Sequence, residues 1–353
     1  MISVIERRVS LADQAEDRYP RLAFEVPEGT VSFEARLEVE GGAVIDLGCE
    51  DPGGWRGWSG GARTSFVITR DDATPGYLPG NLVPGRWHVV LGLHSLPEGE
   101  ATVRVTVESP SPRPPDHGLV EEPATREARG SDRALPAPAG LHWYAGDLHT
   151  HSLHSDGALS LWELANEGVR SGLDFLCVSD HNTTSHHAHL AEVGRRQGIV
   201  LVPGQEVTTH QGHANAFGAI GFVDFRRPAT EWVSTVAERG GLLSINHPVS
   251  DDCSWLHPLV EAPWGVELYH GTWYDDPIST GALAWYVGRD TALIGGGDFH
   301  NRSTPLRPGL PTTWVLAEEN TPEALLSGMA AGRTTITAST RGGRSASTAT
   351  ARV

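Results

Sequence analysis

The sequence predicts an α/β fold in which a parallel sheet, closed or wrapped by helices, follows a small all-β sandwich. One observation is a series of short alternating apolar and polar runs early in the chain, with Gly, Pro and Asp between them. The other is a later alternation of apolar runs and amphipathic stretches, the pattern of repeated β-α units. These patterns predict a sandwich over residues 1–108, a Pro-rich linker over 109–140, a barrel over 141–340 and a flexible tail over 341–353.

The predicted sandwich consists of short runs in which every second side chain is apolar. Such runs, separated by turn residues at close spacing, are typical of antiparallel sandwiches. They are found at residues 22–26, 31–39, 65–68, 87–92 and 101–107. The hairpin that begins at Pro84-Gly85-Arg86-Trp87 resembles the last hairpin of jelly-roll accessory domains. The next segment is rich in Pro, Glu and Arg and poor in apolar residues, which is typical of a linker.

The later region alternates predicted strands and helices. Apolar runs predict strands at residues 141–145, 173–178, 199–202, 242–245 and 291–294. Helices are predicted to begin near Ser160, a residue suited to N-capping, near Thr230, and at Thr321-Pro322, with proline in the first turn.

Composition excludes several classes of protein. The chain has 353 residues, a formal charge of −17 and 39% hydrophobic residues, so it can form ordinary cores, and its charge argues against long nucleic acid as a partner. No run approaches the roughly 20 apolar residues of a membrane helix, and the charged start is unlike a secretory signal, so we expect a cytoplasmic protein. The three cysteines are widely spaced and indicate neither a disulfide framework nor a thiolate zinc site. All 27 basic residues are arginine, so lysine is not available as a catalytic base.

Polar residues of the metal-binding type follow the predicted strands. His149 and His151 stand two apart after a buried run, so both side chains project from one face and can bind one metal ion. The later strands are followed by Asp180-His181, by Glu206, by Asn246-His247, and by Asp298 and His300. In barrels the carboxyl ends of the strands converge on one face. Imidazole and carboxylate ligands without thiolate suit Zn, Mn or Fe.

This set of residues resembles the PHP (polymerase and histidinol phosphatase) family of metallohydrolases, and within it the CehA/McbA-like branch. The family uses nine ligands in a fixed order, and the positions that match here are His149, His151, Asp156, His181, Glu206, His213, His247, Asp298 and His300. His210 is the alternative for the sixth position. His213 is preferred because it has the Gly-His-x-Asn context of the branch. The resemblance implies a distorted seven-stranded (β/α) barrel.

The resemblance also implies how two or three divalent ions would be shared. His149, His151, Glu206 and Asp298 would hold the first metal. Glu206 would bridge to a second, completed by His213 and His247, and Asp156, His181 and His300 would hold a third. Asp147, Asp180 and Asn246 each neighbour a ligand and are expected to orient it.

The function predicted first is a metal-dependent phosphoesterase that acts on a small phosphorylated molecule or nucleotide through a metal-bound hydroxide. The catalytic candidates are Glu206, His270, Arg302 and Arg307. Structural roles remain open for His270 and for both arginines, which would bind phosphate. One alternative is a carbamate, ester or amide hydrolase, as the branch implies. A second is a non-catalytic binding module whose sandwich recognises a ligand through Trp55, Trp58 and Trp87.

Overall fold

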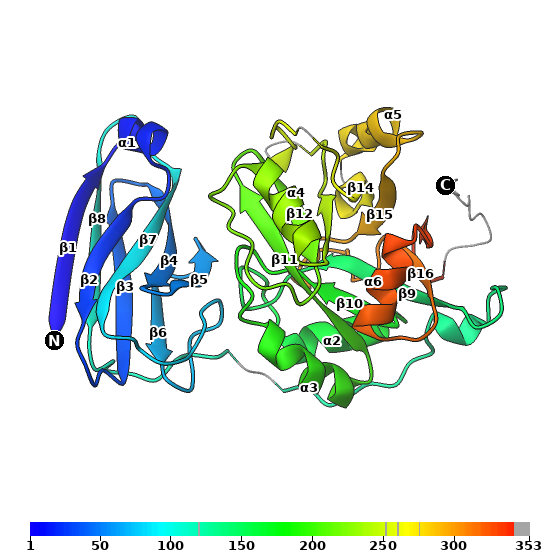
Figure 1. Ribbon diagram of the computed structural model, residues 1–353, viewed down its shortest axis with the longest axis horizontal. Helices are drawn as coiled ribbons and strands as arrows, with labels where there is room; N and C mark the ends of the chain where they lie inside the picture. The colour runs from blue at the N-terminus through cyan, green and yellow to red at the C-terminus, as the bar shows by residue number, and fades with distance from the viewer. Residues whose placement is uncertain (119–120, 251–252, 260, 275, 342–353) are drawn as a thin grey trace. The chain divides into compact units, whose positions relative to one another are not determined.

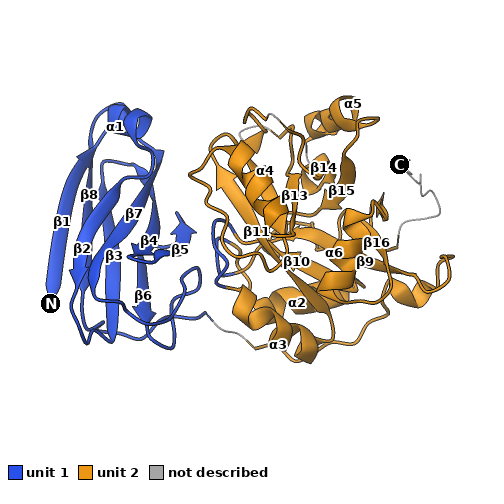
Figure 2. Ribbon diagram, in the orientation of Figure 1, with its two compact units in different colours: residues 1–119, 153–156, 181–185 blue, residues 120–152, 157–180, 186–353 orange. Residues whose placement is uncertain are grey.

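A computed structural model describes residues 1–118, 121–250, 253–259, 261–274 and 276–341. The predicted tail lies outside the described residues beyond position 341. The chain divides into two compact units, shown in Figure 2. The first contains residues 1–119 with two short loops, 153–156 and 181–185, and the second contains the remaining residues. None of the described helices is long and apolar enough to cross a membrane.

The first unit is an antiparallel sandwich of two four-stranded sheets (Figure 1). One sheet has the order β1-β8-β3-β6, with bounds Ile2–Val9, Ala101–Glu108, Ser32–Glu40 and Ser65–Thr69. The other has the order β2-β7-β4-β5, with bounds Arg21–Val26, Gly85–Ser95, Val44–Asp51 and Gly54–Gly60. The short helix α1, Leu11–Glu16, is capped by Ser10 and Asp13 in a reciprocal capping box. The predicted all-β sandwich is therefore confirmed.

Alternating apolar residues of both sheets form the core of the sandwich. Phe24, Phe33 and Trp87 pack ring against ring at its centre, with Phe33 and Trp87 centroids 5.3 Å apart. Trp87 is fully buried and Trp58 is 3% exposed. Two of the three tryptophans named for ligand recognition are thus core residues. They are not available on the surface to contact a ligand, as the binding-module alternative requires.

Two loops carrying proposed metal ligands belong to the first unit. The Arg63 guanidinium donates to the carbonyl of Leu153 and, over 3.1 Å, to that of Ser155. The Gly76 amide donates to Ser185 Oγ over 3.1 Å. The backbone next to Asp156 and His181 is thereby held by hydrogen bonds within this unit.

The second unit contains a nine-stranded sheet of order β15-β14-β13-β12-β11-β10-β9-β16-β17. Its strands, in chain order, are β9 (His142–Thr150), β10 (Phe175–Val178), β11 (Val200–Thr209), β12 (Gly212–Phe217), β13 (Leu242–Ile245), β14 (Gly265–His270), β15 (Ala292–Gly296), β16 (Thr312–Ala317) and β17 (Thr334–Thr337). The sheet curls until its ends meet. The Gly295 amide donates to Thr313 Oγ1, and that hydroxyl donates to the Gly295 carbonyl, each over 2.8 Å. The predicted α/β fold with a barrel-like sheet is confirmed.

The sheet has nine strands where the resemblance implied seven. β9, β10 and β11 are parallel neighbours, as are β13, β14 and β15. β12, β16 and β17 instead pair antiparallel with their neighbours. The additional strands arise because the chain returns directly from β11 as a hairpin, and because a last strand follows the final helix.

Helices cover the outer face of the sheet, as Figure 1 shows for α2, α3, α4 and α6. The α-helices are α2 (Leu161–Arg170), α3 (His187–Gln197), α4 (Ala229–Glu238), α5 (Ala282–Tyr286) and α6 (Pro322–Ala330). The 3-10 helices are η1 (Ser131–Arg133), η3 (Gly271–Tyr274) and η4 (Pro277–Gly281). Ser160 caps α2 through a capping box with Glu163, and Thr321 caps α6 with Pro322 in its first turn.

Part of the segment expected as a linker packs on the second unit. Arg129 donates to the Leu173 carbonyl over 2.6 Å, and Ser131 donates its amide to the Asp174 carboxylate over 3.0 Å. A segment poor in apolar residues can still dock through hydrogen bonds, here to Leu173 and Asp174 just ahead of strand β10.

Candidate metal centre

The end of β9 places two buried imidazoles beside two carboxylates. His149 and His151 are both fully buried. His149 Nε2 lies 3.2 Å from Glu206 Oε1 and 3.2 Å from Asp298 Oδ1. His151 Nε2 lies 3.4 Å from Glu206 Oε2 and 2.9 Å from Asp298 Oδ1. Potential ligand atoms of these four residues all lie within 4.8 Å of one another.

The hairpin of β11 and β12 brings further imidazoles to Glu206. Thr208 pairs with His213 and Glu206 with Asn215, so His213 is the diagonal neighbour of Glu206 on one face. His213 Nδ1 lies 3.2 Å from Glu206 Oε1, and His247 Nε2 lies 3.5 Å from the same oxygen. Glu206 is thus surrounded by four imidazoles, those of His149, His213 and His247 at Oε1 and that of His151 at Oε2. His210, the alternative to His213, has no metal-type group assigned to it among the described residues.

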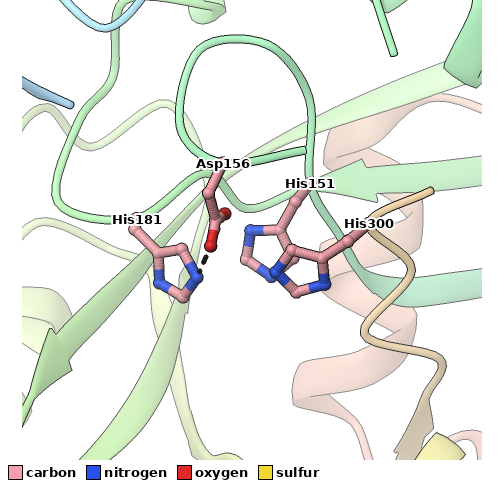
Figure 3. A group of neighbouring side chains, drawn as sticks. All are labelled: His151, Asp156, His181 and His300. Carbon is pink, nitrogen blue, oxygen red and sulfur yellow. Dashed lines mark ion pairs between the residues drawn. The ribbon is translucent and has the colours of Figure 1, made fainter. Parts of the chain in front are cut away.

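A second group of neighbouring side chains comprises His151, Asp156, His181 and His300, which point toward one another in Figure 3. His181 Nε2 lies 3.5 Å from Asp156 Oδ1. The rings of His151 and His300 stack with centroids 4.2 Å apart. His300 Nδ1 donates to the Asp298 carbonyl over 2.8 Å, so the proton of the neutral ring lies on Nδ1.

These residues fit divalent metal ions. His149 Nε2 and Asp298 Oδ1 are buried and meet no hydrogen-bond partner in the part of the chain that the structure describes. Buried polar atoms generally have hydrogen-bond partners, and a bound cation would satisfy this converging pair of acceptors. The donor set is imidazole and carboxylate, which suits Zn, Mn and Fe.

Electrostatics at the centre favour positive charge. Burial alone would lower the pKa of His149, but the carboxylates of Asp298, Glu206 and Glu267 raise it well above its usual value. Burial would raise the pKa of Asp298, yet His149 and His300 hold it well below its usual range. The carboxylates therefore stay ionised, and they favour a positive charge beside them, either a protonated imidazole or a metal ion.

Backbone strain is concentrated at the same place. Among the described residues, four that are not glycine have a positive φ, and three of these are Asn182 (53°), His247 (25°) and Asp298 (52°). His247 and Asp298 are proposed ligands, and Asn182 follows the ligand His181. L-residues adopt this region at a cost of roughly 1–3 kcal/mol, which is typical of functional sites.

Two of the three residues predicted to support the ligands act through the backbone. Asp147 is fully buried and accepts backbone hydrogen bonds from His149 (3.0 Å), Gly297 (2.9 Å) and Gly309 (2.7 Å). Burial raises its pKa to about 6 although these bonds lower it. Asp180 accepts from the Ser152 amide over 2.8 Å, just after the proposed ligand His151.

Sequence reasoning missed Glu267, a buried carboxylate on β14. It is 1% exposed, and its Oε1 lies 3.1 Å from His149 Nδ1. Its position three residues before His270 gave no metal motif. The only signal in the sequence was indirect, in Gly296, whose missing side chain leaves room for the Glu267 carboxylate.

The substrate-contacting candidates are placed differently from what we expected. His270 is 2% exposed, and it offers a ring nitrogen within 4.8 Å of ring nitrogens of His149 and His247, so that these three residues form a further group that could hold a metal ion. Arg302 contacts three carboxylates, with Nε 2.8 Å from Glu167, and Arg307 donates to the carbonyls of Thr304 and Leu306. Burial argues against substrate contact for His270, and neutralisation by carboxylates argues against phosphate binding by Arg302. Arg302 lies in a loop and pairs with the carboxylates of Glu163 and Glu167 on α2. The sequence alone does not reveal this contact.

Comparison with curated proteins finds short matches. The chain is 36% identical over 64 residues to a 5'-3' exoribonuclease of Haemophilus influenzae, covering 18% of this chain and 23% of that protein. It is 33% identical over 64 residues to a phosphoribosyl 1,2-cyclic phosphate 1,2-diphosphodiesterase of Eggerthella lenta, covering 18% and 24%. It is 29% identical over 134 residues to a 3',5'-nucleoside bisphosphate phosphatase of Chromobacterium violaceum, covering 37% and 44%. The matched segments thus span less than half of each of these relatives, and no protein-family profile matches the chain.

Comparison with solved structures finds distant likenesses. A two-domain protein of Bacteroides vulgatus, containing a predicted PHP-like metal-dependent phosphoesterase, has a TM-score of 0.44 and 19% identity, covering 63% of this chain and 69% of that one. An amidohydrolase from Chromobacterium violaceum has a TM-score of 0.34 and 15% identity, covering 44% and 88%.

Proposed function

We propose that the second unit is a PHP-type, metal-dependent phosphoesterase that hydrolyses a small phosphorylated molecule or nucleotide. The observation that carries the proposal is the convergence of His149, His151, Glu206 and Asp298, with unsatisfied buried acceptors at its centre. The hairpin segment Gly212-His213-Ala214-Asn215 supports the proposal that the chain belongs to the CehA/McbA-like branch.

The proposed ligands divide into three sets. His149, His151, Glu206 and Asp298 would hold one ion, and Glu206 would share a second with His213 and His247. Asp156, His181 and His300 would hold a third. When bound, such ions lower the pKa of a water and neutralise charge on a phosphoryl group.

The protein's own contribution is to hold these ligands in place before the ions bind. Asn246 donates to Glu206 Oε1 over 2.7 Å, which orients the carboxylate proposed to bridge two ions. Asp147 holds the backbone of His149 against that of Gly297, next to Asp298. Pre-oriented ligands lose little entropy when the ions bind, and they fix the position of a reacting phosphoryl group.

A phosphoester is favoured over a carbamate because the three curated relatives described above carry names of enzymes that cleave phosphate esters. The relatives' substrates also define a panel for the test. We would purify the protein without chelators, measure Mn, Zn and Fe by mass spectrometry, and assay p-nitrophenyl phosphate, a nucleoside 3',5'-bisphosphate and 1-naphthyl carbamates. Bound divalent metal with phosphate release is the expected result. A wide preference for the carbamates would replace the proposed substrate class with the alternative.

The decisive variant replaces His149 and His151 with alanine together. It is expected to lose bound metal and at least about 10³-fold in turnover, since two ligands of one ion are removed. His142→Ala is the matched control, because His142 lies on the same strand and is exposed. Unchanged turnover in the double variant would refute the proposed centre.

A further inference from the structure

Strand β14 ends in two buried polar side chains, Glu267 and His270, that belong to none of the proposed ligand sets. Glu267 is 1% exposed and His270 is 2% exposed. Both side chains point toward proposed ligands rather than toward solvent, and each contact specifies where a proton lies.

Glu267 contacts two ligands through different oxygens. Its Oε1 lies 3.1 Å from His149 Nδ1, and its Oε2 accepts the His247 backbone amide over 2.9 Å. An ionised carboxylate only accepts, so the His149 proton lies on Nδ1 and the lone pair of Nε2 faces Glu206 and Asp298. Glu267 therefore sets His149 in the tautomer that a metal ion requires and holds the strained backbone of His247.

His270 has the opposite tautomer. The Thr272 amide donates to His270 Nδ1 over 3.1 Å, and the Thr272 hydroxyl lies 3.0 Å from the same nitrogen. An Nδ1 that accepts leaves the proton of the neutral ring on Nε2. Nε2 lies 3.6 Å from Asp298 Oδ2 and 3.6 Å from Glu267 Oε2, which are ion-pair rather than hydrogen-bond distances. In this tautomer Nε2 carries the proton and has no lone pair to offer a metal ion.

The glycine at position 296 shows that this arrangement is built into the backbone. A Cβ at Gly296 would stand 1.9 Å from Glu267 Oε1 and 2.6 Å from the Cβ of His149. Its φ is not positive, so the requirement for glycine here is space rather than conformation. Strand β15 thus leaves room for the Glu267 carboxylate to reach His149.

From these contacts we propose that Glu267 and His270 form an anchoring pair: positioning residues that bind no metal themselves but orient the ligands of the first ion. Glu267 fixes His149 and His247. His270 places its Nε2 beside Asp298 Oδ2, 3.6 Å away, and leaves Oδ1, the oxygen nearest His149 and His151, for the ion. This inference rests on the proposed metal centre and assigns a role to two residues outside it.

The first test measures metal affinity rather than turnover. Mn²⁺ and Zn²⁺ dissociation constants are measured by competition with a fluorescent chelator for wild type, Glu267→Gln and the control Glu261→Gln, whose carboxylate is exposed ahead of the same strand. Glu267→Gln is expected to bind the first ion about 10–100-fold more weakly, and Glu261→Gln to match wild type. Wild-type affinity in Glu267→Gln overturns the proposal.

The second test separates a donor from a ligand at position 270. His270→Gln keeps an N–H donor at a similar reach, whereas His270→Leu keeps only volume. We expect Gln to retain affinity within about threefold and Leu to lose about tenfold or more, with metal stoichiometry unchanged. Equal losses in both variants with one ion fewer per chain would make His270 a ligand and overturn the proposal. This pair also carries the test if circular dichroism shows that Glu267→Gln does not fold.

The two proposals can fail separately. Wild-type protein that binds metal but hydrolyses no phosphoester refutes the proposed function and leaves the anchoring pair standing. Wild-type protein that binds no divalent ion refutes both.

Discussion

Asn246 Nδ2 donates a hydrogen bond to Glu206 Oε1 over 2.7 Å, and both side chains are fully buried. The other end of the same amide accepts the Asn215 backbone amide over 3.1 Å. Asn246 therefore links the strand that carries Glu206 to the strand that carries His213 through a side chain with both polar atoms engaged.

Replacing Asn246 with alanine should lower kcat/KM by about 10–100-fold, because the carboxylate proposed to bridge two ions loses its orienting donor. Activity is measured on the preferred phosphoester at saturating metal. Asn81→Ala, at an exposed asparagine, is the control. Activity within twofold of wild type would mean that Glu206 is held adequately by its imidazoles alone.

Removal of metal should give the protein an unusual stability profile with pH. The pKa values of His149 and His247 are raised by neighbouring carboxylates. Their protonated rings therefore add to the free energy of unfolding below pH 6.5, and this contribution is lost as pH rises through their pKa values in the folded protein. The pKa of the buried Asp147 is raised from 3.8 to about 6, so the stability that its protonated form contributes is lost as pH rises between these two values. The pKa values of Glu267 and Asp298 are lowered. Their ionised carboxylates therefore add to the free energy of unfolding above about pH 4.5, and this contribution is lost on further acidification.

The chelator-treated protein should accordingly have its highest Tm at about pH 5–6 and a Tm several degrees lower at pH 8. Excess Mn²⁺ should abolish the decline, since the ion replaces the protons. Differential scanning fluorimetry across the pH range checks both curves. A metal-free Tm that rises steadily from pH 6 to pH 8 would contradict the predicted signs.

Gly296→Ala should lower the free energy of unfolding by about 1–3 kcal/mol and weaken metal binding, because the added methyl group displaces Glu267 or His149. Urea unfolding of the metal-free protein measures the first effect. The control is Gly99→Ala, where an added Cβ meets nothing within 4 Å. Equal stability of the two variants would show that β15 can shift at no cost.

Arg302→Gln should lower Tm slightly and leave kcat/KM within about threefold, because the guanidinium of Arg302 is engaged by Glu122, Glu163 and Glu167. Steady-state kinetics on the phosphoester are measured beside Arg307→Gln. A KM raised tenfold or more in either variant would restore the phosphate-binding role that the sequence suggested for that arginine.

What the sequence could predict follows from chain connectivity. The carboxyl ends of the strands lie on one face of any β/α barrel. His149, Glu206 and Asp298 could therefore be expected to lie near one another from the sequence alone. Ser160 could be predicted as a helix cap because capping is local. Both inferences needed only neighbours along the chain or the direction of a strand.

What the sequence could not predict depends on partners chosen in three dimensions. Glu267 lies in a strand whose alternation of apolar and polar residues is also found in ordinary half-exposed strands. Its carboxylate turns inward because Gly296, on the neighbouring strand, has no side chain to exclude it. Arg302 was interpreted from its place after a ligand, but the acidic face of α2 lies closer to it. The strand count differed because a short hairpin and a late strand carry weak apolar patterns.

The β11–β12 hairpin limits which mutations this chain can tolerate. Glu206 and His213 meet only because Thr208 is opposite His213, and side chains alternate between faces along each strand. A substitution in the turn at 210–211 can be harmless, whereas the gain or loss of a single codon there would rotate one of the two residues to the far side. In related sequences that retain these proposed metal ligands, we expect substitutions in this turn but no insertions or deletions of an odd number of residues.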